Sequence, residues 1–124
     1  MPDPIRNGEY AHCICDFSGM PIGATDIDAF IDIKNRAFVF GEAKHENSAV
    51  PLGQRLALER LTDAVHRGGI PAFCFVVSHH DKGDIDIAKA DVSEYRWRGQ
   101  WHRGTGTFGD AASFLMKQYG YRVD

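Results

Sequence analysis

Two stretches of alternating apolar and polar residues lie close together in the first half of the chain, ATDIDAFIDI at 24–33 and AFVFGEAK at 37–44. A period of two is typical of a β-strand that buries one of its faces. Only Lys-Asn-Arg at 34–36 separates the two stretches, and so short a polar connection favours a turn. We therefore predict two adjacent antiparallel strands, Ala24–Ile33 and Ala37–Lys44.

Helical spacing and a long apolar run define the elements that follow. Pro51 suits a first helical position, Gly68 and Gly69 can end that helix, and Thr107 and Asp110 have the spacing of a capping box. The patterns predict a helix over 52–67, a buried strand over 70–78, two shorter polar strands within 84–101 and a helix over 107–119. The apolar stripes expected to face the sheet are Leu52, Leu56, Leu61, Ala64 and Val65 in the first helix and Phe108, Ala111, Ala112, Leu115 and Tyr119 in the second. The fold class is therefore α/β, a mixed central β-sheet with flanking helices.

The composition is that of one folded domain. The chain has 124 residues, of which 44% are hydrophobic and 25% are charged. We find no repeat, linker or low-complexity tract, so residues 1–124 form a single unit with residues 1–9 as a loose arm. The net charge of −3 provides no general attraction to nucleic acid or to an anionic membrane. Any binding of a polyanion must therefore use a local basic patch.

The three cysteines, Cys13, Cys15 and Cys74, are an odd number without the spacing of a disulfide framework. No apolar signal segment precedes them, and no apolar run approaches the length needed to cross a membrane. We therefore expect a reduced, cytoplasmic protein with no membrane partner. A zinc site built from these thiols and nearby histidines is an alternative, although Cys-x-Cys alone fits no common structural spacing.

Carboxylates gather on the predicted hairpin. Alternation places Asp26 and Asp28 on one face of the first strand, and Glu42 and Lys44 on one face of the second. Pairing about the short turn brings Asp28 towards Glu42, because opposed side chains lie roughly 4.5–5.5 Å apart. Two carboxylates that close repel each other unless a cation lies between them, and Mg²⁺ prefers oxygen ligands of this kind. Lys44 points into the same space, where it could hold a water or a phosphate oxygen.

This set of residues resembles the PD-(D/E)XK nuclease superfamily, and in particular its small Holliday-junction-resolvase and phage-nuclease branches. The superfamily pattern is an acidic residue on one strand, Glu/Asp-x-Lys on the neighbouring strand and often Gln on the helix behind. The matching residues are Asp28, Glu42-Ala43-Lys44 and Gln54. The resemblance covers residues 22–78, and its signal lies in residue types that fall on the right elements in the right order.

The sequence departs from the superfamily pattern at two places. The first acidic position reads TDID, so Asp26 is an alternative to Asp28; we prefer Asp28 because the apolar AFI that follows it matches the strand of the family. The superfamily also usually has a helix before its first strand, and residues 1–20 show no pattern of one. We expect either a shortened N-terminus or a helix supplied by a partner subunit.

The resemblance implies a restriction-endonuclease-like core and hydrolysis of DNA phosphodiester bonds. Asp28, Glu42 and the backbone carbonyl of Ala43 would hold one or two Mg²⁺ ions, with Mn²⁺ as a possible substitute. Lys44 would position or help to deprotonate the attacking water, and Gln54 would orient the site through hydrogen bonds. DNA is then the expected partner, and a homodimer is expected because two-fold symmetry gives each strand of a symmetric DNA its own active site.

Three other interpretations compete with an active nuclease. The fold can serve as a catalytically inactive module that binds nucleic acid or a protein. The cysteines and histidines can instead organise a structural metal site. Finally, Glu42 and Lys44 can form an ordinary pair where a surface strand enters solvent.

A second candidate region, YRWRGQWHRG at 95–104, mixes cationic and aromatic side chains. Cationic groups suit phosphates, and aromatic rings can stack on unpaired bases. The residues assigned to nucleic-acid binding are Arg96, Trp97, Arg98, Trp101 and Arg103. An exposed hairpin edge would carry similar amphipathic side chains, so both interpretations stand. The aspartate-rich stretch at 81–91 alternates and is expected to form a solvated strand rather than a calcium loop.

Overall fold

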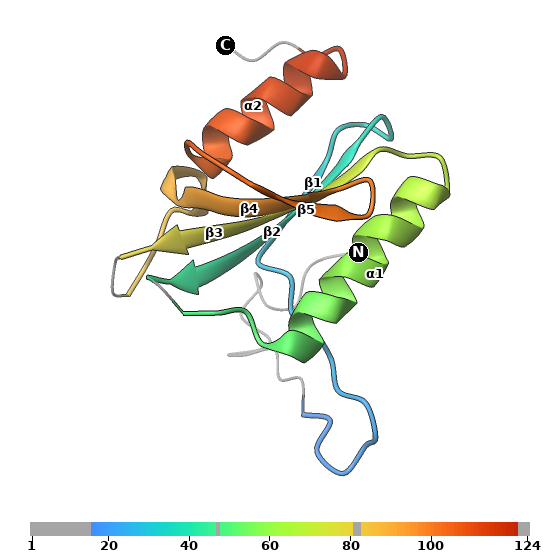
Figure 1. Cartoon of the computed structure of the whole chain (residues 1–124), viewed down its shortest axis with the longest axis vertical. Helices are drawn as coiled ribbons and strands as arrows, with labels where there is room; N and C mark the ends of the chain where they lie inside the picture. Colours follow the sequence, from blue (N-terminus) through green and yellow to red (C-terminus); the bar gives the residue numbers. More distant parts are fainter. Residues whose placement is uncertain (1–15, 47, 81–82, 122–124) are drawn as a thin grey trace, which may run out of the picture.

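The computed structural model of the chain describes residues 16–46, 48–80 and 83–121. These residues form five strands, two α-helices and one short 3-10 helix (Figure 1). In chain order the elements are β1 (Ala29–Asp32), β2 (Phe38–His45), α1 (Leu52–Arg67), β3 (Ala72–His79), η1 (Ile87–Lys89), β4 (Asp91–Trp97), β5 (Gln100–Arg103) and α2 (Phe108–Gln118). The strands form one mixed sheet, so the predicted α/β class is confirmed.

The strands lie in the sheet in the order in which they occur along the chain. The pair β1–β2 is antiparallel, β2–β3 is parallel, and the pairs β3–β4 and β4–β5 are again antiparallel. The parallel pair needs a crossover connection, and α1 provides it. The predicted hairpin is confirmed, since Lys34 and Asn35 in its turn both have positive φ and the side chain of Asp32 accepts the N–H of Asn35.

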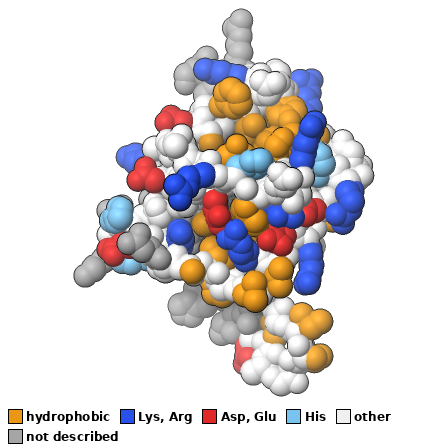
Figure 2. Space-filling view, in the orientation of Figure 1, with side chains coloured by type: hydrophobic (Ala, Val, Ile, Leu, Met, Phe, Trp, Pro, Cys, Tyr) orange, Lys and Arg blue, Asp and Glu red, His pale blue; other side chains and the backbone are white. Residues whose placement is uncertain are grey.

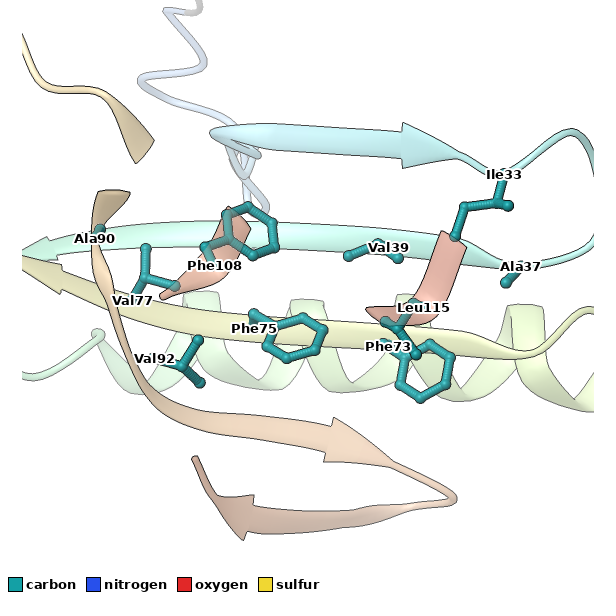
Figure 3. Close-up of a cluster of buried hydrophobic side chains, with 10 residues drawn as sticks. All are labelled: Ile33, Ala37, Val39, Phe73, Phe75, Val77, Ala90, Val92, Phe108 and Leu115. Atoms are coloured by element: carbon teal, nitrogen blue, oxygen red, sulfur yellow. The ribbon is translucent and has the colours of Figure 1, made fainter. Parts of the chain in front are cut away.

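The two helices cover opposite faces of the sheet (Figure 1). On the α2 side, Phe108 and Leu115 of the helix join the apolar side chains that β2, β3 and β4 direct to that face (Figure 3). On the α1 side, Leu58 packs on Phe40 and Cys74. The result is a three-layer domain in which successive residues of β2 enter different cores, as the period of two requires.

The first strand is shorter than predicted. It spans Ala29–Asp32 instead of Ala24–Ile33, so Asp26 and Asp28 precede the strand instead of sharing one of its faces. The side chain of Asp28 accepts the N–H of Ala43 at 2.8 Å, which takes the place of a further ladder bond to β2. Side chains of this type compete with backbone ladders for N–H groups, and the alternating pattern does not reveal that competition. No helix precedes β1 within residues 16–28.

Two further predictions need correction. Residues 84–90 hold η1 instead of a strand, because the side chain of Asp86 accepts the N–H of Ala88 and caps a tight turn. In α1 the buried residues are Leu58 and Thr62, whereas Leu52 is 71% exposed and Ala64 is also exposed. The helix was placed correctly and the stripe in part, because Leu61 and Val65 pack against the core of Phe40, Leu58 and Cys74.

The second helix begins as predicted. The hydroxyl of Thr107 accepts the N–H of Asp110 at 3.2 Å, which is the first half of a capping box. The buried strand at 70–78 is also confirmed as β3, and the two polar strands within 84–101 correspond to β4 and β5. The proposed arm at 1–9 and the residues His12, Cys13 and Cys15 lie outside the described residues. In the described part of the chain no helix is both long and apolar enough to span a membrane.

Candidate active site

Glu42 occupies a nearly closed position on the α1 face of the sheet. It lies in β2, between Phe40, which enters the core, and Lys44, which approaches solvent, and the residue is only 8% exposed. Gln54, in the first turn of α1, donates its side-chain N–H to Glu42 Oε1 at 2.7 Å. The short connection from β2 to α1 brings these two residues together, as the predicted role of Gln54 requires.

The second oxygen of Glu42 accepts no hydrogen bond, and the Asp28 carboxyl lies close enough to share a proton with the Glu42 carboxyl. Oε2 is buried and accepts no hydrogen bond from any described residue. An unsatisfied carboxylate oxygen inside a protein costs about 1–3 kcal/mol or more, so such an atom requires a physical explanation. Either a proton or a cation can supply the missing interaction.

The pKa of Glu42 reflects this environment. Burial, and next the negative charge of Asp28, raise the pKa of the Glu42 carboxyl to about 7, and the hydrogen bond from Gln54 opposes them. Asp26 contributes only a smaller Coulombic part of the same rise. Asp28 therefore acts on the Glu42 carboxyl more strongly than Asp26 does.

Asp28 is fixed by the backbone of β2. Its Oδ2 accepts the N–H of Ala43, and this contact holds an exposed carboxylate beside a buried one. In an extended strand the N–H and C=O of one residue point to the same neighbouring strand. The Ala43 carbonyl therefore points to the side on which Asp28 lies, beyond the end of β1. Asp28 and this carbonyl thus lie on the same side of β2, next to Glu42 along the strand.

These oxygens fit a hard divalent cation. Mg²⁺ takes one or two carboxylates and keeps water on its other positions, so two carboxylates and a carbonyl suffice. The buried, unpartnered Glu42 Oε2 is the kind of atom that such a cation would satisfy. Across the described ranges no group of three His, Cys, Asp or Glu side chains gathers closely enough to hold a metal.

Lys44 lies on the same face as Glu42, and its ammonium group is not engaged elsewhere. No ion pair or side-chain hydrogen bond of Lys44 occurs among the described residues. Its side chain lines a hollow that also involves the hairpin of β4 and β5. A cation without a partner among the described residues, two positions along the strand from Glu42, is available for an anionic substrate.

The predicted nucleic-acid-binding residues separate into two groups. Arg96 donates two hydrogen bonds to Asp63, and the Trp101 indole N–H donates to Glu59 at 2.7 Å. Trp97 stacks on Phe73 at a centroid distance of 4.3 Å and an interplanar angle of 4°, so this ring is part of the packing.

The second group is exposed. Arg98 and Arg103 are exposed, and Arg103 lines the same hollow as Lys44. For Arg96, Trp97 and Trp101 the structural interpretation of an amphipathic hairpin therefore accounts for the contacts.

Sequence reasoning missed a ladder of charges that attaches α1 to β4 and β5. Arg55, Glu59 and Asp63 lie four residues apart on one side of α1. Arg55 pairs with Glu94 and lies over the ring of Trp101 at 4.2 Å from the centroid. Figure 2 shows Lys, Arg, Asp and Glu side chains intermixed on the visible face. The spacing of four was the signal that could have revealed this ladder.

The described cysteine shows no sign of reactivity or metal binding. Cys74 is buried in β3, and burial raises the pKa of its thiol to about 12. A thiol that stays protonated is a small apolar core residue. The zinc alternative would need Cys13 and Cys15, which lie outside the described residues.

Comparisons with protein-family models, with curated proteins and with solved structures find no match to this chain.

Proposed function

We propose that the protein is a Mg²⁺-dependent hydrolase of DNA phosphodiester bonds, as its resemblance to the PD-(D/E)XK nucleases implies. The observation that carries the proposal is the buried Oε2 of Glu42, which accepts no hydrogen bond and lies close to the Asp28 carboxylate. A solvated strand end would have no reason to bury a carboxylate to 8% exposure. Mn²⁺ is the expected substitute ion.

Each residue has a definite part in the proposed chemistry. A bound Mg²⁺ would lower the pKa of water and neutralise charge on the phosphate. Asp28, Glu42 and the Ala43 carbonyl would bind that ion, and Gln54 would keep Glu42 in position through its hydrogen bond to Oε1. Lys44 would orient the attacking water and stabilise the negative charge that grows on the phosphate in the transition state.

The proposal is tested with a panel of linear, nicked, forked and four-way DNAs incubated with Mg²⁺ or with EDTA. We expect cleavage that requires the metal and that Glu42→Gln abolishes, while thermal unfolding shows that the variant is folded. Gln retains the shape of Glu and can still accept the bond from Gln54, so a loss of cleavage reports on the charge.

Two other outcomes of the panel have distinct meanings. Binding of DNA without cleavage of any member would support the alternative of an inactive nuclease-fold module. Mg²⁺ that binds equally well to the protein and to Glu42→Gln would contradict the metal site itself. Homodimer formation and a cytoplasmic location remain proposals, which rest on the symmetry of DNA substrates and on cysteine usage.

A further inference from the structure

A hollow of about 350 Å³ is lined by Lys44, which lies two positions from Glu42 in β2. It extends from β2 to the hairpin of β4 and β5, and Lys44 belongs both to this hollow and to the strand that carries Glu42. We call it the Lys44–Arg103 cleft. Its lining residues are Lys44, Ser93, Glu94, Trp101, His102 and Arg103.

Two cations of the cleft lack partners. Neither Lys44 nor Arg103 forms an ion pair or a side-chain hydrogen bond within residues 16–46, 48–80 and 83–121. By contrast, Arg55 and Arg96 on the same face are paired with Glu94 and Asp63. Cationic side chains that remain unpaired at the rim of a hollow are available for an anion that comes from solution.

The other lining residues do not cancel this charge. The carboxylate of Glu94 is neutralised by Arg55, with Arg55 Nη2 and Glu94 Oε2 at 3.3 Å. The Trp101 indole N–H is bound to Glu59, and the ring of His102 stacks on Tyr95 at 5.1 Å. The charge that the cleft offers to a ligand is therefore positive and comes from Lys44 and Arg103.

The distance across the cleft suits a polymer better than a single anion. Three strand spacings separate β2 from β5, which amounts to about 14 Å between their backbones. Lys44 and Arg103 have long side chains that can approach each other from the two sides of this gap. A ligand with regularly spaced negative charges can contact both cations at the same time.

We propose that the cleft holds the phosphate next to the one that is cleaved, and that Arg103 is a positioning residue for the DNA backbone. The inference rests on the proposed function, because it takes the phosphodiester substrate from there. The planar guanidinium group of Arg103 can donate two parallel hydrogen bonds to a phosphate. Arg103 then determines affinity and the position of the strand, and Lys44 lies between the two phosphates.

The test measures binding of fluorescein-labelled single-stranded and duplex DNA by anisotropy in EDTA, where a metal-dependent site cannot cleave. The variants are Arg103→Ala, Arg103→Lys and the control Arg60→Ala, which removes an exposed arginine of α1 outside the cleft. We expect Arg103→Ala to raise Kd roughly tenfold and to reduce the slope of log Kd against log salt by about 0.7–0.9, the contribution of one phosphate contact. Arg103→Lys should keep the slope, and Arg60→Ala should leave both quantities unchanged.

Equal Kd values and salt slopes for Arg103→Ala and Arg60→Ala would overturn the inference. DNA binding that depends on Arg103 without cleavage of any DNA in Mg²⁺ would support the cleft and contradict the hydrolase. Cleavage that Glu42→Gln abolishes and Arg103→Ala leaves unchanged, in both rate and KM, would support the hydrolase and contradict the cleft. Because binding in EDTA and cleavage in Mg²⁺ are separate readouts, the two proposals can fail independently.

Discussion

At the scale of single residues, the candidate site depends on how two neighbouring positions of one strand are partnered. Glu42 is buried with one oxygen bound to Gln54 and the other bound to nothing described, whereas Lys44 is half-buried and unpaired. If Glu42 and Lys44 served only to stabilise the strand, their side chains would form an ion pair with each other. Because the two side chains have different environments, we expect different effects when each residue is replaced.

Replacing Lys44 tests whether its charge acts on a substrate. Lys44→Ala should lower the rate of Mg²⁺-dependent DNA cleavage by about 10²–10³-fold, the usual loss for one preorganised electrostatic contact. Metal binding should persist because Asp28 and Glu42 remain, and calorimetric titration with Mn²⁺ measures it. The matched control is Lys117→Ala, an exposed lysine of α2 on the opposite side of the sheet. Equal cleavage rates in the two variants would mean that Lys44 is an ordinary surface charge.

Replacing Glu42 tests the burial of its carboxyl group in metal-free protein. The pKa of Glu42 is raised from 4.5 to about 7, so between these values the folded state holds a proton that the unfolded chain has released. Stability must then fall as pH rises through this window, by about 1–3 kcal/mol in total. Urea unfolding in EDTA from pH 4 to pH 8 measures it. In Glu42→Gln the free energy of unfolding should not show this part of the decline with pH. If the free energy of unfolding depended on pH in the same way in both proteins, the raised pKa of Glu42 would be contradicted.

At the scale of elements, α1 is attached to the sheet by two different kinds of contact. Leu58 enters an apolar core with Phe40 and Cys74, while Arg55, Glu59 and Asp63 form charged contacts with β4 and β5. The pKa of Asp63 is lowered, chiefly by its hydrogen bonds from Arg96. Since Gln54 lies at the start of the same helix, these contacts also help to set the position of the group that holds Glu42.

Breaking the pair between Asp63 and Arg96 should loosen this attachment. Asp63→Ala leaves the guanidinium of Arg96, only 13% exposed, without its main acceptor. We expect a loss of about 1–3 kcal/mol in the free energy of unfolding, measured in urea. Asp63→Ala combined with Arg96→Met should recover part of the loss, because no unpaired charge remains. Asp84→Ala, which removes an exposed aspartate, is the control, and an equal effect there would show that the pair contributes nothing.

At the scale of the whole molecule, β2 connects the candidate site to the core on the other side of the sheet. Glu42 and Lys44 face α1, whereas Gly41 and Ala43 face α2. The ring of Phe108 packs so closely on Gly41 that a Cβ atom there would lie 2.7 Å from the ring. The packing of α2 and the position of Glu42 are therefore set by adjacent residues of one strand.

Adding a methyl group at Gly41 should disturb both sides of the sheet. Gly41→Ala forces Phe108 to move within a packed core, and we expect a loss of about 1–3 kcal/mol in the free energy of unfolding. Gly53→Ala is the control, because a Cβ atom at that exposed helical position meets nothing within 4 Å. Thermal unfolding compares the two, and an equal or higher Tm for Gly41→Ala would contradict the close packing.

The predicted homodimer is tested by light scattering. Either β4 and β5 or α2 can supply the contact between two copies, and Phe114 of α2 is 65% exposed. A contact through α2 would cover this side chain. Phe114→Asp should convert a dimer to a monomer. A monomer for the unmodified protein at working concentration would remove this prediction.

Much of the fold could be read from local patterns. The hairpin about 34–36, the helix over 52–67, the buried strand that follows it and the cap at Thr107 all depend on contacts within a few residues, so the sequence alone determined them. The same alternation placed Glu42 and Lys44 on one face of β2. Gln54 was assigned to the helix behind that strand, and its bond to Glu42 agrees with that assignment.

Only the tertiary structure decided how far each side chain is buried and what it contacts. Asp28 lies outside β1, where its carboxylate accepts the N–H of Ala43, a residue 15 positions away. Arg96 and Trp101 looked available for nucleic acid but are bound by Asp63 and Glu59 of α1, whereas Arg103 remained unpaired. Such pairings join segments distant in sequence and depend on the docking angle of α1, which no local pattern encodes. The physical reason is that sequence periodicity determines on which face of a strand or helix a side chain lies. The groups that the side chain contacts depend on which other element packs against that face.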